Sequence, residues 1–206
     1  MTGVAKNTIV KLLVELGDAC TKYQDAALRD LPCKRLQCDE IWAFVGAAYD
    51  FMQDVASRLR GRVQLTTDGH KPYLAAVEDA FGADIDYATL TKIYGADPEG
   101  EKRYSPAKCL GCEVKTVQGA PDAKHISRSY VERENLSMRM SMRRFTHLTN
   151  AFSKKVENHA AAVARYFMYY KFGRVHQTLR MTPAIEAGSP TMCGRSKRSW
   201  GCSALG

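Results

Sequence analysis

Hydrophobic residues recur at steps of three and four positions along five stretches of the chain, which is the spacing of one helix face. These stretches predict helices at residues 3–29, 47–60, 72–81, 130–146 and 152–172. Alternating or short apolar runs predict strands at residues 34–45, 62–67 and 85–94. Residues 95–121 are rich in glycine, proline and charge, and indicate an irregular excursion with a small hairpin near 114–117. The order of strands and helices predicts an α/β fold.

The composition limits the class of protein. The chain has 206 residues, of which 45% are hydrophobic and 25% charged, so we expect one globular domain with room for a small appendage. Every long apolar stretch contains a charged residue, which argues against a membrane span. The first residues lack the apolar segment of a signal peptide, so we expect a cytoplasmic protein. The seven cysteines would then be free thiols, and the single C-x-x-C at Cys109 and Cys112 lacks the second pair that a structural zinc site needs.

Positive charge is concentrated in one segment. Residues 124–174 hold 11 Lys and Arg against three Asp and Glu, and this difference of +8 equals the net charge of the whole chain. A basic block in an otherwise neutral protein predicts a polyanionic partner, with nucleic acid first. A solvated helix face or a membrane-surface patch is the alternative.

The helix predicted at residues 3–29 begins with a glycine turn and polar residues, including Lys6 and Asn7. This pattern is typical of the recognition helix of a helix-turn-helix, whose first residues meet bases and phosphates. The preceding partner helix is absent from the sequence, so the pattern indicates either a partial DNA-binding domain or an ordinary amphipathic helix.

Two acidic residues stand in distinctive places. Asp39 lies within the first predicted strand and Asp68 at the end of the second. A carboxylate among apolar neighbours costs desolvation energy unless a cation or hydrogen-bond donors compensate it. If the two strands are adjacent, both aspartates can face one pocket, and Glu132 or Glu134 from the basic helix could complete a site for Mg²⁺ or Mn²⁺. A helix cap, a turn aspartate or a surface charge is the alternative for each residue.

Five segments resemble one known family in the same order along the chain. They are LQCDEIW at 36–42, LTTDGH at 65–70, SYVERENL at 129–136, RMSMRRF at 139–145 and YYKFGRVHQTLRMTP at 169–183. They are similar to motifs of bacterial insertion-sequence transposases of the insertion-sequence-one type, which belong to the DDE class and have a ribonuclease H-like core. The resemblance spans about residues 2–187 and implies a mixed sheet with flanking helices.

The resemblance also implies the site residues. Asp39, Asp68 and Glu132 would be the catalytic residues and the ligands of Mg²⁺ or Mn²⁺, and Glu132 is preferred to Glu134 because it directly precedes the Arg-x-Asn-Leu element. Glu132, Asn135 and Arg139 share one helix face. Contacts to DNA are expected from Lys6, Asn7, Arg139, Arg143, Arg144, Lys154, Lys155, Arg174 and His176. For His176, capping of the long helix is an equal alternative.

The implied function is metal-dependent DNA cleavage and strand transfer in transposition. The expected partners are double-stranded DNA, as transposon ends and target, and further copies of the chain in an active homo-oligomer. The protein would be cytoplasmic in a bacterium and associated with the nucleoid when bound to DNA. A catalytically inactive remnant that only binds DNA, and an α/β scaffold with no nucleic-acid role, are the alternatives.

The chain also departs from the family pattern. Only 28 residues, 40–67, separate Asp39 from Asp68, and they cannot hold a helix together with the hairpin of strands 2 and 3 that the core requires. We therefore expect an internal deletion near residues 45–47. The expected domains are a partial helix-turn-helix-like remnant at 1–31, the deleted catalytic domain at 34–187, and a disordered, frameshifted tail at 188–206.

Overall fold

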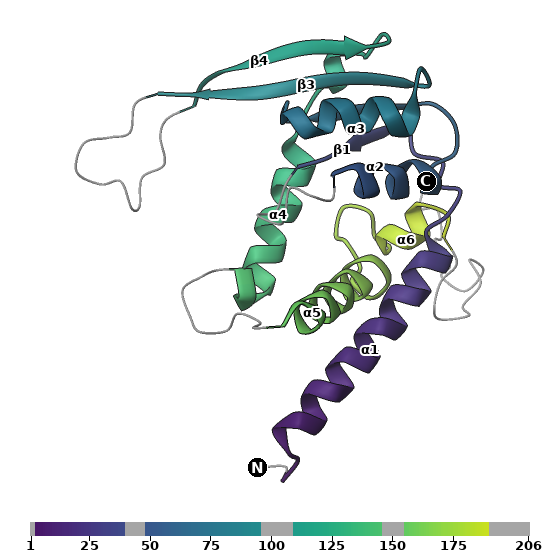
Figure 1. Ribbon diagram of the computed structural model, residues 1–206, viewed down its shortest axis with the longest axis vertical. Coiled ribbons are helices and arrows are strands. Elements are labelled where there is room, and N and C mark those ends of the chain that lie inside the picture. The colour runs from purple at the N-terminus through teal and green to yellow at the C-terminus, as the bar shows by residue number, and fades with distance from the viewer. Residues whose placement is uncertain (1–2, 40–47, 96–108, 146–154, 190–206) are drawn as a thin grey trace, which may run out of the picture. The chain divides into compact units, whose positions relative to one another are not determined.

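The chain forms two compact units in the computed structural model. The structure describes residues 3–39, 48–95, 109–145 and 155–189. One unit consists of residues 1–31 with 142–206, and the other of residues 32–141. The first is mainly helical in its described part, and the second contains the sheet (Figure 1). No helix in the described ranges is long and apolar enough to cross a membrane.

The second unit is built on a four-stranded mixed sheet. Its strands are β1 (Arg35–Gln37), β2 (Val63–Thr67), β3 (Ile85–Tyr94) and β4 (Cys109–Gln118). They lie in the order β1-β2-β3-β4, with β1, β2 and β3 parallel and β4 antiparallel to β3. Parallel neighbours require crossover connections, which helices α2 (Ala48–Arg58) and α3 (Lys71–Phe81) supply.

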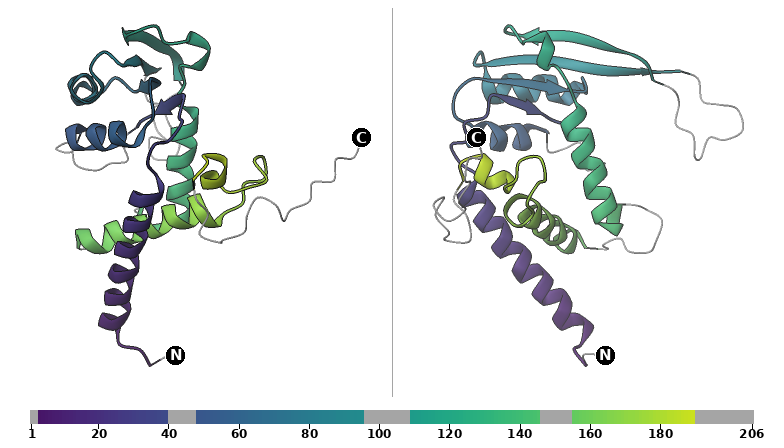
Figure 2. Two further views of the ribbon diagram at one scale, coloured as in Figure 1. Left: turned by 90° about the vertical axis from the view of Figure 1, so that its right-hand side faces the viewer. Right: turned by 180° about the vertical axis from the view of Figure 1, so that it is seen from behind.

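One face of this sheet carries the hydrophobic core. Alternate residues of β2 and β3 point toward α2 and α3, which lie on the same side of the sheet (Figure 2). The fully buried members are Met52, Val63, Leu65, Ala76, Val77, Ile85 and Tyr87. Helix α3 begins with a proline in its first turn and ends at Gly82, whose positive φ of 52° suits a residue without a Cβ.

Helix α4 (Ser129–Ser141), which follows the short 3₁₀ helix η2 (Ala123–His125), begins at the opposite face of the sheet and runs away from it (Figure 2). Gln64 of β2 fixes the approach to this helix, because its amide exchanges two hydrogen bonds with the backbone of Asp122. Gln37 of β1 fixes the helix itself, since its Oε1 accepts hydrogen bonds from the backbone N–H groups of Tyr130 and Val131. The start of α4 is therefore tied to the two strands that precede Asp39 and Asp68.

The helical unit packs α1 (Lys6–Ala27) against α5 (Val156–Met168). Gly17 faces Ala161 so closely that a Cβ at Gly17 would collide with it, which explains a small residue at this position. Gln24 adds a hydrogen bond of 3.0 Å from its Nε2 to the carbonyl of Ala164. The other elements of this unit are the 3₁₀ turn η3 (Arg143–Phe145), the π-helical turn η4 (Tyr169–Gly173) and α6 (Pro183–Glu186).

The prediction of an α/β fold is confirmed as a mixed four-stranded sheet flanked by helices. Residues 109–118 contradict the predicted irregular excursion, because they form the ten-residue strand β4. Both faces of β4 are largely exposed, so its sequence lacks the alternation that reveals a half-buried strand. The first strand is shorter than predicted and ends at Gln37, which places Asp39 beyond the strand.

Several predictions stay predictions. The junction at 45–47 and the tail from residue 190 onward lie outside the described residues. The same holds for the start of the helix predicted at 152–172, of which α5 and η4 form the described part. The predicted domain spans also stay predictions, while the compact units group residues 1–31 with the C-terminal helices.

Candidate active site

Strand register brings the two predicted aspartates opposite each other. Arg35 pairs with Gln64 and Gln37 with Thr66, and the N–H of Cys38 continues this ladder with a 3.0 Å hydrogen bond to the carbonyl of Thr66. The same offset of 29 residues relates Asp39 to Asp68. Adjacent parallel strands lie about 4.8 Å apart, and residues in register point to the same face. Both carboxylates therefore belong to the carboxyl ends of neighbouring strands, on the face where the first turn of α4 is attached.

Asp68 occupies the turn between β2 and α3. Its Oδ1 accepts a 2.9 Å hydrogen bond from the N–H of His70, and its carbonyl accepts one of 3.0 Å from the hydroxyl of Thr91. Gly69 has a positive φ of 86°, and a Cβ there would lie 3.2 Å from the Thr91 hydroxyl. Asp68 is therefore a turn aspartate, which is one of the structural roles that the sequence left open for it. Its Oδ2 has no hydrogen bond or ion pair among the described residues.

Glu132 lies in the first turn of α4 and reaches toward β3. Its Oε2 forms a 2.6 Å ion pair with Nζ of Lys92, and both side chains are about two-thirds covered. The hydrogen bond to Glu132 is the main cause of the raised pKa of Lys92, so this lysine stays positively charged at neutral pH. Glu132 is therefore held in place by Lys92 of β3.

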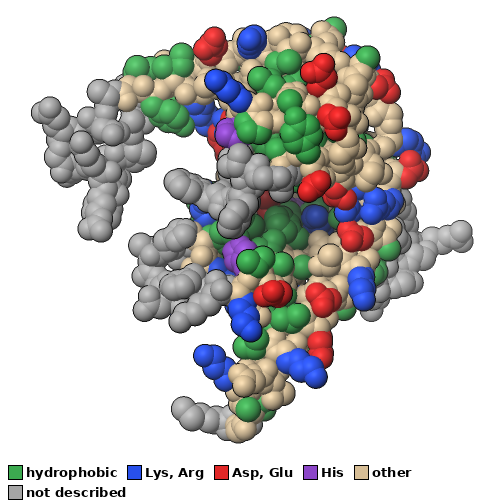
Figure 3. All heavy atoms as spheres, viewed as in Figure 1, with side chains coloured by type: hydrophobic (Ala, Val, Ile, Leu, Met, Phe, Trp, Pro, Cys, Tyr) green, Lys and Arg blue, Asp and Glu red, His purple; other side chains and the backbone are tan. Residues whose placement is uncertain are grey.

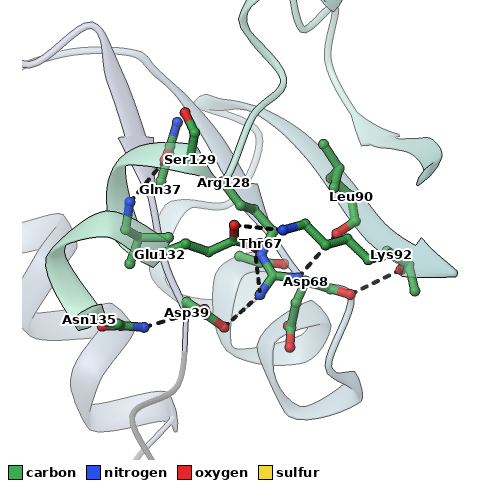
Figure 4. Close-up of polar contacts among 12 residues, drawn as sticks. Gln37, Asp39, Thr67, Asp68, Leu90, Lys92, Arg128, Ser129, Glu132 and Asn135 are labelled. Atoms are coloured by element: carbon green, nitrogen blue, oxygen red, sulfur yellow. Dashed lines mark hydrogen bonds and ion pairs between the residues drawn. The ribbon is translucent and has the colours of Figure 1, made fainter. Parts of the chain in front are cut away.

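Arg128 joins two of the predicted site residues. One of its terminal nitrogens lies 2.8 Å from Oδ1 of Asp39 and 4.0 Å from Oε1 of Glu132. These distances put the two carboxylate oxygens within 6.8 Å of each other, the sum of the two. Figure 4 shows the guanidinium between the two acidic side chains, with Asp68 beside them. The Arg128 side chain is only 13% exposed, so these ion pairs are poorly screened by water.

Asn135 and Cys38 complete the surroundings of Asp39. Nδ2 of Asn135, which is 7% exposed, donates a 3.4 Å hydrogen bond to Oδ2 of Asp39 (Figure 4). Burial, and secondarily the charge of Asp39, raises the pKa of the Cys38 thiol to about 12. Cys38 is therefore a neutral thiol at physiological pH. The helix face predicted to carry Glu132 and Asn135 does point both side chains toward this region.

The described arrangement is an ion-pair network. No three His, Cys, Asp or Glu side chains within the described ranges lie close enough together to hold one metal ion. Carboxylate oxygens such as those of Asp39, Asp68 and Glu132 are nevertheless the hard donors that suit Mg²⁺ or Mn²⁺. Two cations, Arg128 and Lys92, now balance two of the three negative charges. The donor chemistry fits a divalent ion, and its approach requires the Arg128 guanidinium to move aside.

The residues predicted to contact DNA are distributed over both units. Arg139 is exposed on α4, in the unit that contains the acidic residues. In the helical unit, Lys6 and Asn7 begin α1 and are exposed, as are Arg143 and Lys155, whereas Arg144 is half-buried. Arg174 is exposed after η4, and Lys154 lies outside the described residues. Helix α1 carries both basic and acidic side chains rather than a purely basic surface, as Figure 3 shows for one face.

His176 lies in the turn that follows η4 and is half-buried. Its ring makes an edge-on contact with Tyr170 at 5.0 Å between ring centroids. Its backbone accepts a hydrogen bond from Arg180 and donates one to the carbonyl of Met181. These contacts give His176 a structural part in closing the turn.

Sequence reasoning missed the two basic residues of the candidate site. Arg128 was counted only as part of the basic segment, and Lys92 was not singled out. The position of Arg128, four residues before Glu132, was the available signal, because residues at that spacing are neighbours on a helix.

Comparison with protein-family models, curated proteins and solved structures found no match.

Proposed function

We propose that this chain is a transposase of the DDE class that cleaves and joins DNA strands with Mg²⁺ or Mn²⁺. The observation that supports this most is the placement of Asp39 and Asp68 at the ends of adjacent strands, with Arg128 in contact with both Asp39 and Glu132. We also propose that the unit with the sheet has a ribonuclease H-like core, which would place its acidic residues at such strand ends.

In this proposal, Asp39, Asp68 and Glu132 hold the divalent ions. When bound, such ions activate a water or a 3′-hydroxyl and stabilise the leaving oxygen of a phosphodiester. Asn135 keeps the Asp39 carboxylate oriented, and Gln37 keeps the first turn of α4 beside the sheet. Lys92 holds the Glu132 side chain over the strand ends. The backbone turn at Asp68 fixes one carboxylate oxygen and leaves the other for a ligand.

The basic residues supply the DNA-binding part of the proposal. Arg139 is exposed on the helix that carries Glu132, about two turns further on, where a guanidinium can pair with phosphate oxygens. Arg143, Lys155 and Arg174 are also exposed. Binding that depends on phosphate contacts weakens as the salt concentration rises.

A catalytically inactive DNA-binding remnant is the second candidate. The observation that favours it is the Arg128 guanidinium, which already neutralises Asp39 and approaches Glu132. An acidic cluster that is permanently compensated in this way would have lost its metal ions while the basic residues kept their affinity for DNA.

A strand-cleavage and strand-transfer assay separates these candidates. The purified full chain is incubated with end-labelled duplex DNA carrying the element's ends, a supercoiled target plasmid and Mn²⁺. The transposase proposal expects products that disappear in Asp68→Ala and in Glu132→Gln. Glu78→Gln, which changes an exposed glutamate of α3, is the matched control and should keep full activity.

Each outcome decides between the candidates. Salt-dependent DNA binding without any product supports the inactive remnant. Product formation that persists in Asp68→Ala contradicts the assignment of the acidic residues. Negligible affinity for duplex DNA at low salt would contradict both candidates and favour an α/β scaffold with no nucleic-acid role.

A further inference from the structure

Arg128 is placed where a cation between Asp39 and Glu132 would be expected. The residue immediately precedes α4, and its carbonyl accepts the N–H of Glu132, so its side chain starts within one turn of the glutamate. The same terminal nitrogen then contacts both carboxylates, at 2.8 Å and 4.0 Å. A point of positive charge shared by two carboxylates from different elements resembles the charge distribution of a bridging metal ion.

The acidic residues need such a cation to stay together. Carboxylates gathered in a partly buried place repel one another and lose hydration, and a guanidinium offsets both costs. Lys92 contributes from the β3 side, but its ion pair is with Glu132. Arg128 therefore links Asp39 to Glu132.

Arg128 is nevertheless incompletely bonded in this position. Its Nε is buried and has no hydrogen-bond partner among the described residues. Its other terminal nitrogen makes only a long 3.4 Å hydrogen bond to the carbonyl of Leu90. A buried donor without a partner costs free energy, so this position is less favourable than a fully bonded one and is easier to leave.

We propose that Arg128 is an internal counter-ion that holds the acidic residues together in the metal-free protein and competes with the divalent cation for them. This inference rests on the proposed function, because it concerns the same three carboxylates. Cation binding displaces the guanidinium from Asp39 and Glu132, and the residue acts as a positioning residue of the metal-free state. Metal affinity is lowered by the free energy needed to separate Arg128 from the carboxylates.

The test measures Mn²⁺ binding to the full chain by electron paramagnetic resonance, near neutral pH and without DNA. We expect Arg128→Met to bind Mn²⁺ about tenfold more tightly than the wild type or better, because a competing charge at salt-bridge distance is removed. Arg133→Met is the matched control, since it removes the same charge from an exposed position on α4, the helix that Arg128 precedes. Its affinity should stay within about twofold of the wild type, as expected for an exposed charge.

Thermal unfolding gives a second readout on the same variants. In EDTA, Arg128→Met should unfold at a lower temperature than Arg133→Met, because its carboxylates have lost their counter-ion. Addition of Mn²⁺ should raise the unfolding temperature of Arg128→Met more than that of the wild type. A variant that folds only when Mn²⁺ is present would be the strongest form of this result.

A measurement on the wild type covers the case in which Arg128→Met does not fold under any condition. The Nε–H signal of Arg128 is followed by ¹⁵N NMR during titration with Mg²⁺, and we expect its shift and proton exchange to change as the site fills. An unchanged signal at saturation overturns the proposal.

The same Mn²⁺ measurements distinguish a failure of the role proposed for Arg128 from a failure of the proposed metal-dependent function. Equal Mn²⁺ affinity in the wild type, Arg128→Met and Arg133→Met overturns the role of Arg128 and leaves the proposed function in place. No Mn²⁺ binding by any of the three proteins overturns the metal-dependent function and the inference with it.

Discussion

Gln37 is one of the side chains that attach the start of α4 to the sheet. Its Oε1 accepts hydrogen bonds of 2.9 Å from the N–H of Tyr130 and 3.2 Å from the N–H of Val131. N–H groups in the first turn of a helix have no partner within the helix, so Gln37 acts as a cap supplied from a neighbouring strand. Gln37→Leu removes the acceptor while keeping a side chain of similar size. We expect this change to loosen the start of α4 and, with it, Glu132.

The magnitude follows from the two lost hydrogen bonds. Each net hydrogen bond contributes about 1 kcal/mol, and loss of a helix cap costs about 0.5–2 kcal/mol. Water can reach the N–H of Tyr130, which reduces the loss, so we expect Gln37→Leu to lower the free energy of unfolding by about 1–2 kcal/mol. For a chain of this length this corresponds to a decrease in Tm of about 3–6 °C.

Urea unfolding measures the loss, and amide hydrogen exchange locates it. Exchange should accelerate at Tyr130 and Val131, while the amides of β2 and β3 change less. Gln53→Leu is the matched control, because Gln53 is exposed on α2 and its side chain bonds only to Asp79 among the described residues. If the amides of Tyr130 and Val131 exchange as in the wild type, the capping role assigned to Gln37 is wrong.

Two further predictions concern the stability of the sheet. Leu65→Ala should lower the free energy of unfolding by about 2–5 kcal/mol in a denaturant titration, because Leu65 is fully buried; a loss below about 1 kcal/mol would contradict the core described above. Arg62 holds the pKa of Asp86 below its ordinary value of 3.8, chiefly through their hydrogen bonds. Asp86→Asn should therefore be less stable than the wild type above about pH 4, and this difference should shrink as the pH falls below 3.8 and the wild-type carboxylate becomes protonated. A difference that is equal at pH 7 and pH 3 in urea titrations would show that charge is not the cause.

The local elements were largely predictable because their signals are local. Helix α3 shows a proline at its start, helical periodicity along its length and Gly82 at its end, and it was predicted within one residue of its observed bounds. Asp68 and Glu132 could likewise be assigned to a strand end and a helix start. Strand β4 could not be predicted, since its order comes from pairing with β3 and not from burial of one face.

The sequence by itself determined the α/β order of elements, the concentration of positive charge in residues 124–174 and the residue types available for chemistry. Only the tertiary structure decided that Asp39 and Asp68 share a strand register, that Arg128 contacts Asp39 and that Lys92 pairs with Glu132. The physical reason is that periodicity and capping act between residues a few positions apart. Strand register and ion pairing depend instead on residues brought together from distant parts of the chain.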